Sequence, residues 1–142
     1  QLAPGTQAVH ALRLRSNHKG EPAMVTDAWV LASVGEKVTQ SELMQKPLYE
    51  ILMDQGIAFG RVVQEISATV GDPHRARLLN TEVGAPLLRM VRLMHDLDEC
   101  PVLHLTIHMA ADRASILMEI AGADVNTLAA GQVVLDAPMA AP

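Results

Sequence analysis

The stretch AVHALRLRSNHKGEPAMVTDAWVL, residues 8–31, predicts a hairpin of two antiparallel strands. Two segments rich in aliphatic side chains flank NHKGEP, whose asparagine, glycine and proline are typical of a turn. Within LRLR, residues 12–15, leucines alternate with Arg13 and Arg15, and alternate side chains of a strand point to opposite faces. The hairpin therefore places two guanidinium groups on one face of a sheet and two leucines on the other.

The position of the two arginines has two interpretations. An antiparallel sheet commonly has one face in water, and spacing alone favours this solvated face for Arg13 and Arg15. If both faces of the strand are covered, however, the two guanidinium groups lie inside and must meet an anion there. The local pattern leaves both interpretations open.

The rest of the chain continues the alternation of strands with short helices. We expect strands at residues 8–16, 23–31, 58–70, 85–96 and 100–110, helices at 46–56 and 72–80, a helical turn beginning at Ser41, and a loop at 32–40. This order of elements predicts an α+β domain with an antiparallel sheet and a few short helices.

The segment KPLYEILMDQG, residues 46–56, is the clearest of the predicted helices. Pro47 suits the first turn, and a glycine ends the segment. Leu48, Ile51 and Leu52 form an apolar stripe at helical spacing. We therefore expect this helix to pack over one face of the sheet through these three side chains.

Composition bounds the class of protein. A chain of 142 residues suits one domain with one core, and with only 2% aromatic residues that core is filled by aliphatic side chains and eight methionines. The net charge of −5 argues against a nucleic-acid footprint on this segment itself. The single cysteine, Cys100, excludes an intrachain disulfide and suits a reducing, cytoplasmic location. No apolar run approaches the roughly 18 residues of a membrane span, so we expect no membrane partner.

Two histidines in LHLTIHM, residues 103–109, have the i, i+4 spacing that binds metals on a helix. Here His104, Thr106 and His108 alternate with apolar residues, which is a strand pattern. On a strand the two histidines lie on the face opposite the apolar side chains. We therefore expect them to be solvated and expect no metal site.

No other cluster in the sequence predicts catalysis. Asp96, Asp98 and Glu99 fall in a predicted hairpin turn, where we expect them to be solvated. The serines lack the glycines of a nucleophile elbow, and Cys100 has no activating pattern around it. We accordingly expect neither enzyme activity nor a cofactor.

An ordered series of short segments resembles one family of effector-binding domains. The series runs through RLR, GEP, PLYEIL, DQGI and QEISA, continues with RLLNTEVGAPLLRMVRLMHDLDECPV, and closes with ADR at residues 111–113. Over about residues 8–120 it resembles the UTRA domain of GntR-type transcription regulators of the HutC/FarR subfamily. The resemblance implies a chorismate-lyase-like α+β fold that binds a small molecule and is attached to an N-terminal winged-helix DNA-binding domain.

The resemblance also implies a domain organisation and a set of partners. Residues 1–142 form a single effector-binding domain, with a core at about 8–120 and a tail at 121–142. The winged-helix domain is absent from this chain, which would explain the start at Gln1 and the acidic charge. The implied partners are a small anionic organic effector, a second copy of the chain in a homodimer, and DNA only through the missing domain.

Family members that bind phosphorylated sugars indicate which residues hold the ligand. The paired arginines of the first strand, here Arg13 and Arg15, hold the anionic group. The start of the helix that contains Leu48 and Tyr49 supplies backbone N–H donors to the same group, which suits an anion at the positive end of a helix. Pro47 stands where the family often has a serine, so this chain lacks one hydroxyl and one N–H donor.

Three sugar-reading positions of the family are altered in this chain. A glutamate falls at Thr26, with the carboxylate moved to Asp27 on the opposite strand face, and a second glutamate and a tyrosine fall at Leu103 and Met109. Such a pocket should reject sugars, because it strips their hydroxyls of water without replacing the hydrogen bonds. We expect an anionic head with an apolar or compact body. The alternative is that Leu103 and Met109 have closed the pocket into ordinary core.

The resemblance thus predicts a ligand sensor that shifts the population of DNA-binding orientations. The alternative function is a chorismate-lyase-type enzyme acting on a small organic acid, which would share the fold and an arginine-lined pocket. The sequence offers no positioned acid–base pair for such an enzyme, and a shared fold does not imply a shared function.

Overall fold

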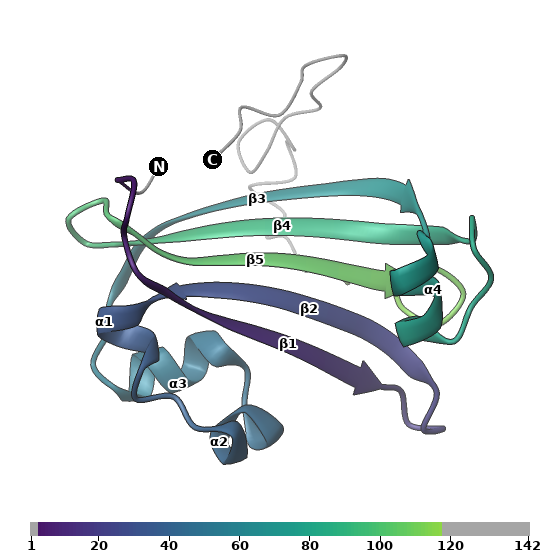
Figure 1. Cartoon of the computed structure of the whole chain (residues 1–142), viewed down its shortest axis with the longest axis horizontal. Helices are drawn as coiled ribbons and strands as arrows, with labels where there is room; N and C mark the ends of the chain where they lie inside the picture. Colours follow the sequence, from purple (N-terminus) through teal and green to yellow (C-terminus); the bar gives the residue numbers. More distant parts are fainter. Residues whose placement is uncertain (1–2, 118–142) are drawn as a thin grey trace, which may run out of the picture.

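The computed structural model of the chain describes residues 3–117. Its centre is a five-stranded antiparallel sheet in the order β1-β2-β5-β4-β3 (Figure 1). The strands are β1 (Ala8–Ser16), β2 (Pro22–Leu31), β3 (Phe59–Val70), β4 (Pro86–Asp96) and β5 (Pro101–Ala110). The helices are α1 (Ala32–Gly35), α2 (Gln40–Gln45), α3 (Leu48–Asp54) and α4 (Pro73–Leu79). The predicted α+β class with an antiparallel sheet is confirmed, and the predicted tail at 121–142 lies outside the described residues.

Two hairpins build most of the sheet. The first joins β1 to β2, and the second joins β4 to β5. The hairpins meet where β2 pairs with β5 from Met24 opposite Met109 to Val30 opposite Leu103. This pairing leaves β1 as one edge of the sheet and β3 as the other.

The pairing register assigns each strand residue to one of two sheet faces. Arg13 lies opposite Thr26 on β2, and Thr26 lies opposite Ile107 on β5, so the three side chains share one face. We call this the pocket face, because residues of α2 and α3 also pack against it. The other face, which we call the outer face, carries α4 near one end, where Leu79 packs against Val25.

Helix α3 supplies the main apolar layer over the pocket face. Leu48, Ile51 and Leu52 are all buried, and Leu48 and Leu52 pack in one cluster with Leu103 and Leu105 of β5. Burial of each large aliphatic side chain contributes about 1.5–3 kcal/mol to stability. The predicted apolar stripe of this helix is therefore confirmed.

Two local structures differ from the sequence prediction or refine it. Residues 32–35 form the short helix α1 rather than a loop, and Gly35 fits there because a Cβ would lie only 2.4 Å from Cγ1 of Val30. Helix α2 begins after Thr39, whose hydroxyl accepts from the backbone N–H of Glu42 while the Glu42 carboxylate accepts from the N–H of Thr39. This capping box fixes the start of α2.

The expectation that both histidines of β5 are solvated is wrong. His104 is half-buried on the outer face, and His108 is only 4% exposed. Arg75 of α4 donates its Nε–H to Nδ1 of His108 at 3.2 Å. Helix α4 therefore covers a strand face that the alternation of polar and apolar residues assigned to water.

The turn between β4 and β5 forms as predicted. Asp96 accepts hydrogen bonds at Oδ1 from the backbone N–H groups of Asp98 and Cys100. Glu99 takes a positive φ of 60° in this turn and is exposed. Across residues 3–117, none of the helices has the length and apolar character that crossing a membrane requires.

Candidate functional site

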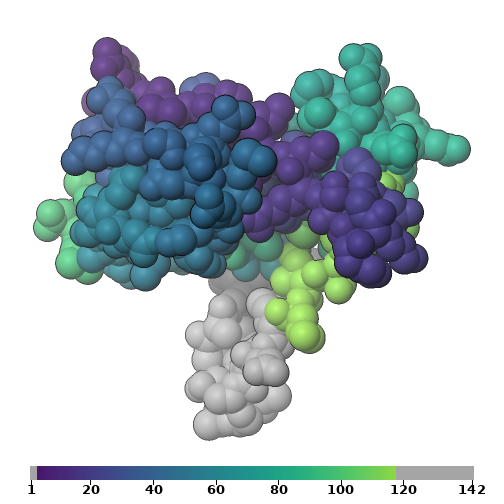
Figure 2. Space-filling view, turned by 90° about the horizontal axis from the view of Figure 1, so that it is seen from below, coloured from purple at the N-terminus to yellow at the C-terminus, as the bar shows by residue number. Residues whose placement is uncertain are grey.

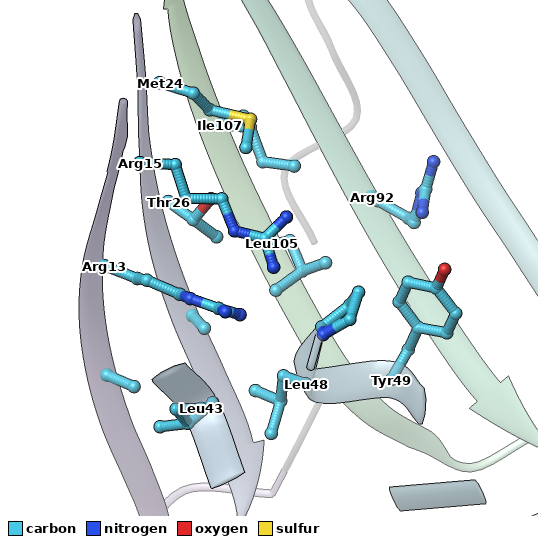
Figure 3. Close-up of a pocket in the computed structure, with 13 residues that line it drawn as sticks. Arg13, Arg15, Met24, Thr26, Leu43, Leu48, Tyr49, Arg92, Leu105 and Ile107 are labelled. Atoms are coloured by element: carbon cyan, nitrogen blue, oxygen red, sulfur yellow. The ribbon is translucent and has the colours of Figure 1, made fainter. Parts of the chain in front are cut away.

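A cavity of about 220 Å³ lies between the pocket face of the sheet and the segment that contains α2 and α3 (Figure 3). Its wall includes residues of β1, β2, β4 and β5 as well as the first turn of α3. The lining residues are Ala11, Arg13, Arg15, Met24, Thr26, Ala28, Leu43, Pro47, Leu48, Tyr49, Arg92, Leu105 and Ile107. Five of the seven residues predicted to bind the ligand thus come together at one cavity.

Arg13 and Arg15 point into this cavity rather than into open water (Figure 3). Both are half-buried, whereas Leu12 is 51% exposed and Leu14 is 46% exposed on the outer face. The solvated position that spacing alone favoured for the arginines is therefore wrong. The strand has its charged side toward the helices and its apolar side toward the surface. This arrangement costs free energy unless the half-buried charges are paired or hydrogen-bonded.

The two arginines differ in how they are held. Nη1 of Arg13 donates to the carbonyl oxygen of Lys46 at 2.8 Å, just before the cavity wall formed by α3. Burial, and then the neighbouring charge of Arg15, lower the pKa of Arg13 below its ordinary value. The guanidinium of Arg15 makes no hydrogen bond or ion pair with any side chain or backbone group of residues 3–117. The cavity therefore presents two adjacent cations, and the guanidinium donors of Arg15 have no acceptor within the described part of the chain.

Arg92 of β4 is a third arginine at the cavity, and the sequence reasoning did not find it. It is half-buried, and Gln64 of β3 accepts at Oε1 from its Nε at 2.9 Å and from its Nη2 at 2.5 Å. Its neighbour along the strand, Arg89, lies on the outer face and pairs with Glu65 at 3.2 Å. Strand alternation puts the two arginines on opposite faces, and the register of β4 against β5, which was not evident from the sequence, decides that Arg92 is the one at the cavity.

Tyr49 lies beside the cavity between Arg92 and the start of α3 (Figure 3). Its hydroxyl donates to Oε1 of Glu50 at 3.1 Å. This bond raises the pKa of Tyr49, burial raises it further, and the charges of Arg92 and Arg15 act in the opposite direction. No aspartate or glutamate is among the residues that line the cavity, so its lining carries three positive charges.

The start of α3 has no side-chain cap, and Pro47 occupies its N-cap position. Within residues 3–117, the backbone N–H groups of Leu48 and Tyr49 have no hydrogen-bond acceptor, and both residues line the cavity. Thr26 contributes a hydroxyl from the floor of the cavity, opposite Arg13. The structure thus brings these groups together at one cavity, and their contacts with a ligand stay a prediction.

Leu103 and Met109 share the pocket face but are not among the residues that line this cavity. Leu103 is 1% exposed and belongs to the cluster under α3, while Met109 is 5% exposed. The aliphatic floor of the cavity consists instead of Leu105 and Ile107, which lie between these two positions on β5. Ligand contacts of Leu103 and Met109 stay a prediction.

A second, more open hollow of about 610 Å³ adjoins the cavity at the β1 edge of the sheet. It shares Arg13, Arg15, Leu43 and Pro47 with the cavity and extends along α2. Figure 2 looks onto this side of the molecule, with β1 between the helices α1–α3 on the left and α4 on the right. The arginine pair therefore lines both the open hollow and the cavity.

Within the described residues, no three histidine, cysteine, aspartate or glutamate side chains come close enough together to hold a metal ion. The groups of the cavity that can meet a ligand are guanidinium and backbone N–H donors, one hydroxyl of Thr26 and one of Tyr49. Such a set can bind an anion, because donors to an anion make strong, charge-assisted hydrogen bonds.

Comparison with protein families gives one match. The family model described as the UTRA domain matches residues 1–115. A comparison with curated proteins finds no match.

Several solved structures that resemble this chain are described as transcriptional regulators. One is a GntR-family regulator from Enterococcus faecalis V583, with a TM-score of 0.75 and 22% identity over 84% of this chain and 85% of that chain. A second is described as the ligand-binding domain of a GntR-family regulator from Bordetella bronchiseptica, with a TM-score of 0.73 and 24% identity over 84% and 75% of the two chains. A third is PhnF from Mycobacterium smegmatis, with a TM-score of 0.73 and 21% identity over 83% of this chain and 52% of that chain. At these identities the structures show a shared fold.

Proposed function

This chain belongs to the UTRA domain family, and on that premise we propose that its cavity binds a small anionic organic effector of a bacterial transcription regulator. The family and its structural relatives make the chain a regulatory ligand-binding domain. The chemistry of the cavity then has to indicate what kind of ligand it takes.

The proposal that the effector is anionic rests on one observation. Arg13 and Arg15 are half-buried at the cavity and have no carboxylate partner within residues 3–117. Two like charges on neighbouring positions of one strand face repel each other, and their partial burial costs hydration. An anion between them removes both costs and can accept from two guanidinium forks at once. The free N–H groups of Leu48 and Tyr49 add donors at the same wall.

The size and lining of the cavity favour a compact ligand with an apolar body. A volume of about 220 Å³ is below the range of roughly 300–1,000 Å³ that drug-sized ligands occupy. Leu48, Leu105 and Ile107 line it with aliphatic surface, and Thr26 is the only aliphatic hydroxyl in the lining. A sugar would lose hydration at several hydroxyls without matching acceptors, so phosphosugars should bind less well than organic acids.

The regulatory output requires a DNA-binding domain, which we place N-terminal to this domain in the full-length protein. The match to PhnF covers only 52% of that chain, which leaves room for a further domain in the longer protein and supports a two-domain arrangement. We propose that two copies of the chain form a homodimer and that the effector stabilises one orientation of the attached winged-helix domains. The effector can shift that equilibrium only by its difference in affinity for the two orientations.

A chorismate-lyase-type enzyme would use the same arginine-lined cavity for an organic acid. Beside its arginines, however, the lining offers a single titratable group, the hydroxyl of Tyr49, and this hydroxyl is bonded to Glu50. General acid–base catalysis needs a group that can reach the reacting proton. The lining therefore favours binding over catalysis.

Calorimetric titration with benzoate, methylphosphonate and glucose 6-phosphate tests the proposal. We expect the first two probes to bind the unchanged domain more tightly than the phosphosugar. Arg15→Gln should weaken them about ten-fold or more, because each charge-assisted hydrogen bond is worth roughly 1.5–3 kcal/mol. Arg77→Gln is the matched control, because this substitution removes the same charge from an exposed residue of α4, far from the cavity. Equal affinity of the parent and Arg15→Gln would contradict the proposal.

A further inference from the structure

The three arginines of the cavity come from strands that are not neighbours. Arg13 and Arg15 stand on β1, and Arg92 stands on β4, with β2 and β5 between them. Neighbouring strands lie about 4.8 Å apart, so the two groups of cations start from backbones separated by roughly 14 Å. Arg13 and Arg15 extend into the cavity from the β1 wall, whereas Arg92 lines its opposite side with the guanidinium turned toward Gln64 of β3 (Figure 3).

Arg92 is oriented by a neutral partner. Gln64 accepts two hydrogen bonds from its Nε and Nη2 and thereby fixes the plane of the guanidinium without neutralising its charge. On the outer face of the same two strands, by contrast, Arg89 has a charged partner and forms an ion pair with Glu65. Within residues 3–117, Arg92 has no carboxylate partner, so its positive charge remains available at the cavity.

An apolar floor separates the two groups of cations. Leu105 lies directly opposite Arg92 across β4 and β5, and Ile107 lies opposite Thr26 across β5 and β2. Both aliphatic side chains line the cavity. Tyr49, Arg15 and Arg92 all line this one cavity, so the two walls face one space.

We propose that the effector is a short dianionic organic acid, with one anionic group held by Arg13 and Arg15 and the second held by Arg92. Its carbon chain then crosses the aliphatic floor formed by Leu105 and Ile107. This inference rests on the proposed function and goes one step further, because a single anion at the β1 wall would leave Arg92 without a counter-charge. It makes Arg92 the residue that distinguishes a diacid from a monoacid.

The test compares diacids with half-amides of the same shape. Malonate, succinate, glutarate and adipate are titrated calorimetrically beside their half-amides, in which one carboxylate is replaced by a neutral amide of nearly equal size. For the diacid that fits best, we expect about ten-fold or tighter binding than for its half-amide, since the second carboxylate gains a charge-assisted pair. Arg92→Gln should remove that preference, because it weakens the diacid much more than the half-amide, whose neutral amide makes no charge-assisted pair with Arg92.

Two further variants keep the result interpretable. Arg92→Lys retains the charge and should retain part of the preference for diacids, whereas Arg77→Gln on α4 should retain all of it. A melting curve of Arg92→Gln shows whether that variant is folded, and if it is not, the comparison of diacids with half-amides on the parent and on Arg92→Lys decides.

The outcomes separate this inference from the proposed function. If diacids and half-amides bind the parent equally and both depend on Arg15, the dianionic effector is wrong and the anionic effector stands. If Arg92→Gln weakens the binding of diacids and of half-amides by the same factor, Arg92 does not bind the second carboxylate, and the inference is again overturned. If none of these acids binds, and benzoate and methylphosphonate do not bind either, both proposals fail.

Discussion

Nη1 of Arg13 donates to the carbonyl oxygen of Lys46 at 2.8 Å, which ties the edge strand β1 to the residue that precedes Pro47 and α3. One arginine of the pair therefore has a structural role as well as its position at the cavity. Arg15, two residues further along the strand, makes no such bond within the described part of the chain. The two residues should consequently separate in their effects on stability.

Arg13→Ala should lower the free energy of unfolding by about 1 kcal/mol, the usual net value of one hydrogen bond. Arg15→Ala should change it by no more than about 0.5 kcal/mol, because it removes no bond within residues 3–117 and relieves the repulsion between the two cations. Urea unfolding of both variants without ligand measures the difference. Equal losses in the two variants would show that the bond to Lys46 does not stabilise β1.

Ile51→Asp should unfold the domain or abolish the cooperativity of its thermal transition. Ile51 is 2% exposed in α3, and a buried carboxylate without a partner costs several kcal/mol. Met53→Asp is the matched control in the same helix, since Met53 is 56% exposed and should tolerate the charge. Similar melting curves for the two variants would mean that α3 presents a different face to the sheet.

Thr26→Glu should leave the domain folded and abolish binding of anionic probes. Thr26 lies directly opposite Arg13 on the neighbouring strand, so a glutamate there can reach the arginines and act as an internal competitor for the anion. Thr26→Gln, of nearly the same size and without charge, should keep most of the affinity. Benzoate titrations of both variants give the comparison, and tight binding by Thr26→Glu would place the anion elsewhere.

Leu103→Glu is expected to destabilise the domain by several kcal/mol rather than to create a reader of sugar hydroxyls. The side chain is 1% exposed and packs in the cluster beneath α3, so a carboxylate at this position would be buried without a donor. Urea unfolding of Leu103→Glu beside Leu103→Met measures the cost of the charge. A stable Leu103→Glu variant that gains affinity for glucose 6-phosphate would place the cavity over residue 103.

Local patterns predicted the elements well, because they depend on neighbours in the sequence. The strand at residues 8–16 was predicted with the bounds that the structure has, and the stripe of Leu48, Ile51 and Leu52 was identified from helical spacing. The choice of face could not be predicted in this way. Arg13 and Leu12 alternate identically whichever side the helices cover, and only the packing of α2 and α3 decides it.

The missed residues share this cause. Arg92 became part of the cavity through the pairing of β4 with β5, and His108 became buried through the docking of α4 on the outer face. The contact of Arg75 with His108 joins residues 33 positions apart, and the place of Arg92 depends on the register of a hairpin and on which face of the sheet α2 and α3 cover. Short-range periodicity contains no information on such contacts.

His108 gives the domain a predictable dependence on pH. Burial is the largest cause that lowers its pKa, the charges of Arg75 and Arg89 lower it further, and Asp72 and Asp27 act in the opposite direction, leaving a pKa of about 4. Because Nδ1 accepts from Nε of Arg75, the folded protein favours the neutral ring with its proton on Nε2. Protonation would place a donor opposite a donor.

The sign of the effect follows from comparing the two states. An unfolded histidine titrates near pH 6.5, so between about pH 6.5 and pH 4 the unfolded chain binds a proton that the folded chain does not. The contribution of His108 to stability is therefore complete above about pH 6.5 and is lost as the pH falls toward 4. Between pH 7.5 and pH 5 the expected loss in the free energy of unfolding is on the order of 1–2 kcal/mol.

Urea unfolding at pH 7.5 and pH 5 of the parent, His108→Gln and His18→Gln measures this effect. His108→Gln keeps an acceptor for Arg75 but cannot titrate, so the difference in stability between the two pH values should shrink by that same amount. His18→Gln, which changes an exposed residue of the β1–β2 turn, should lose as much stability on acidification as the parent. If His108→Gln loses stability as steeply as the parent, His108 is not the buried neutral histidine that its contact with Arg75 implies, and the acid sensitivity of the domain must come from other groups, such as His104, whose pKa is also lowered by burial.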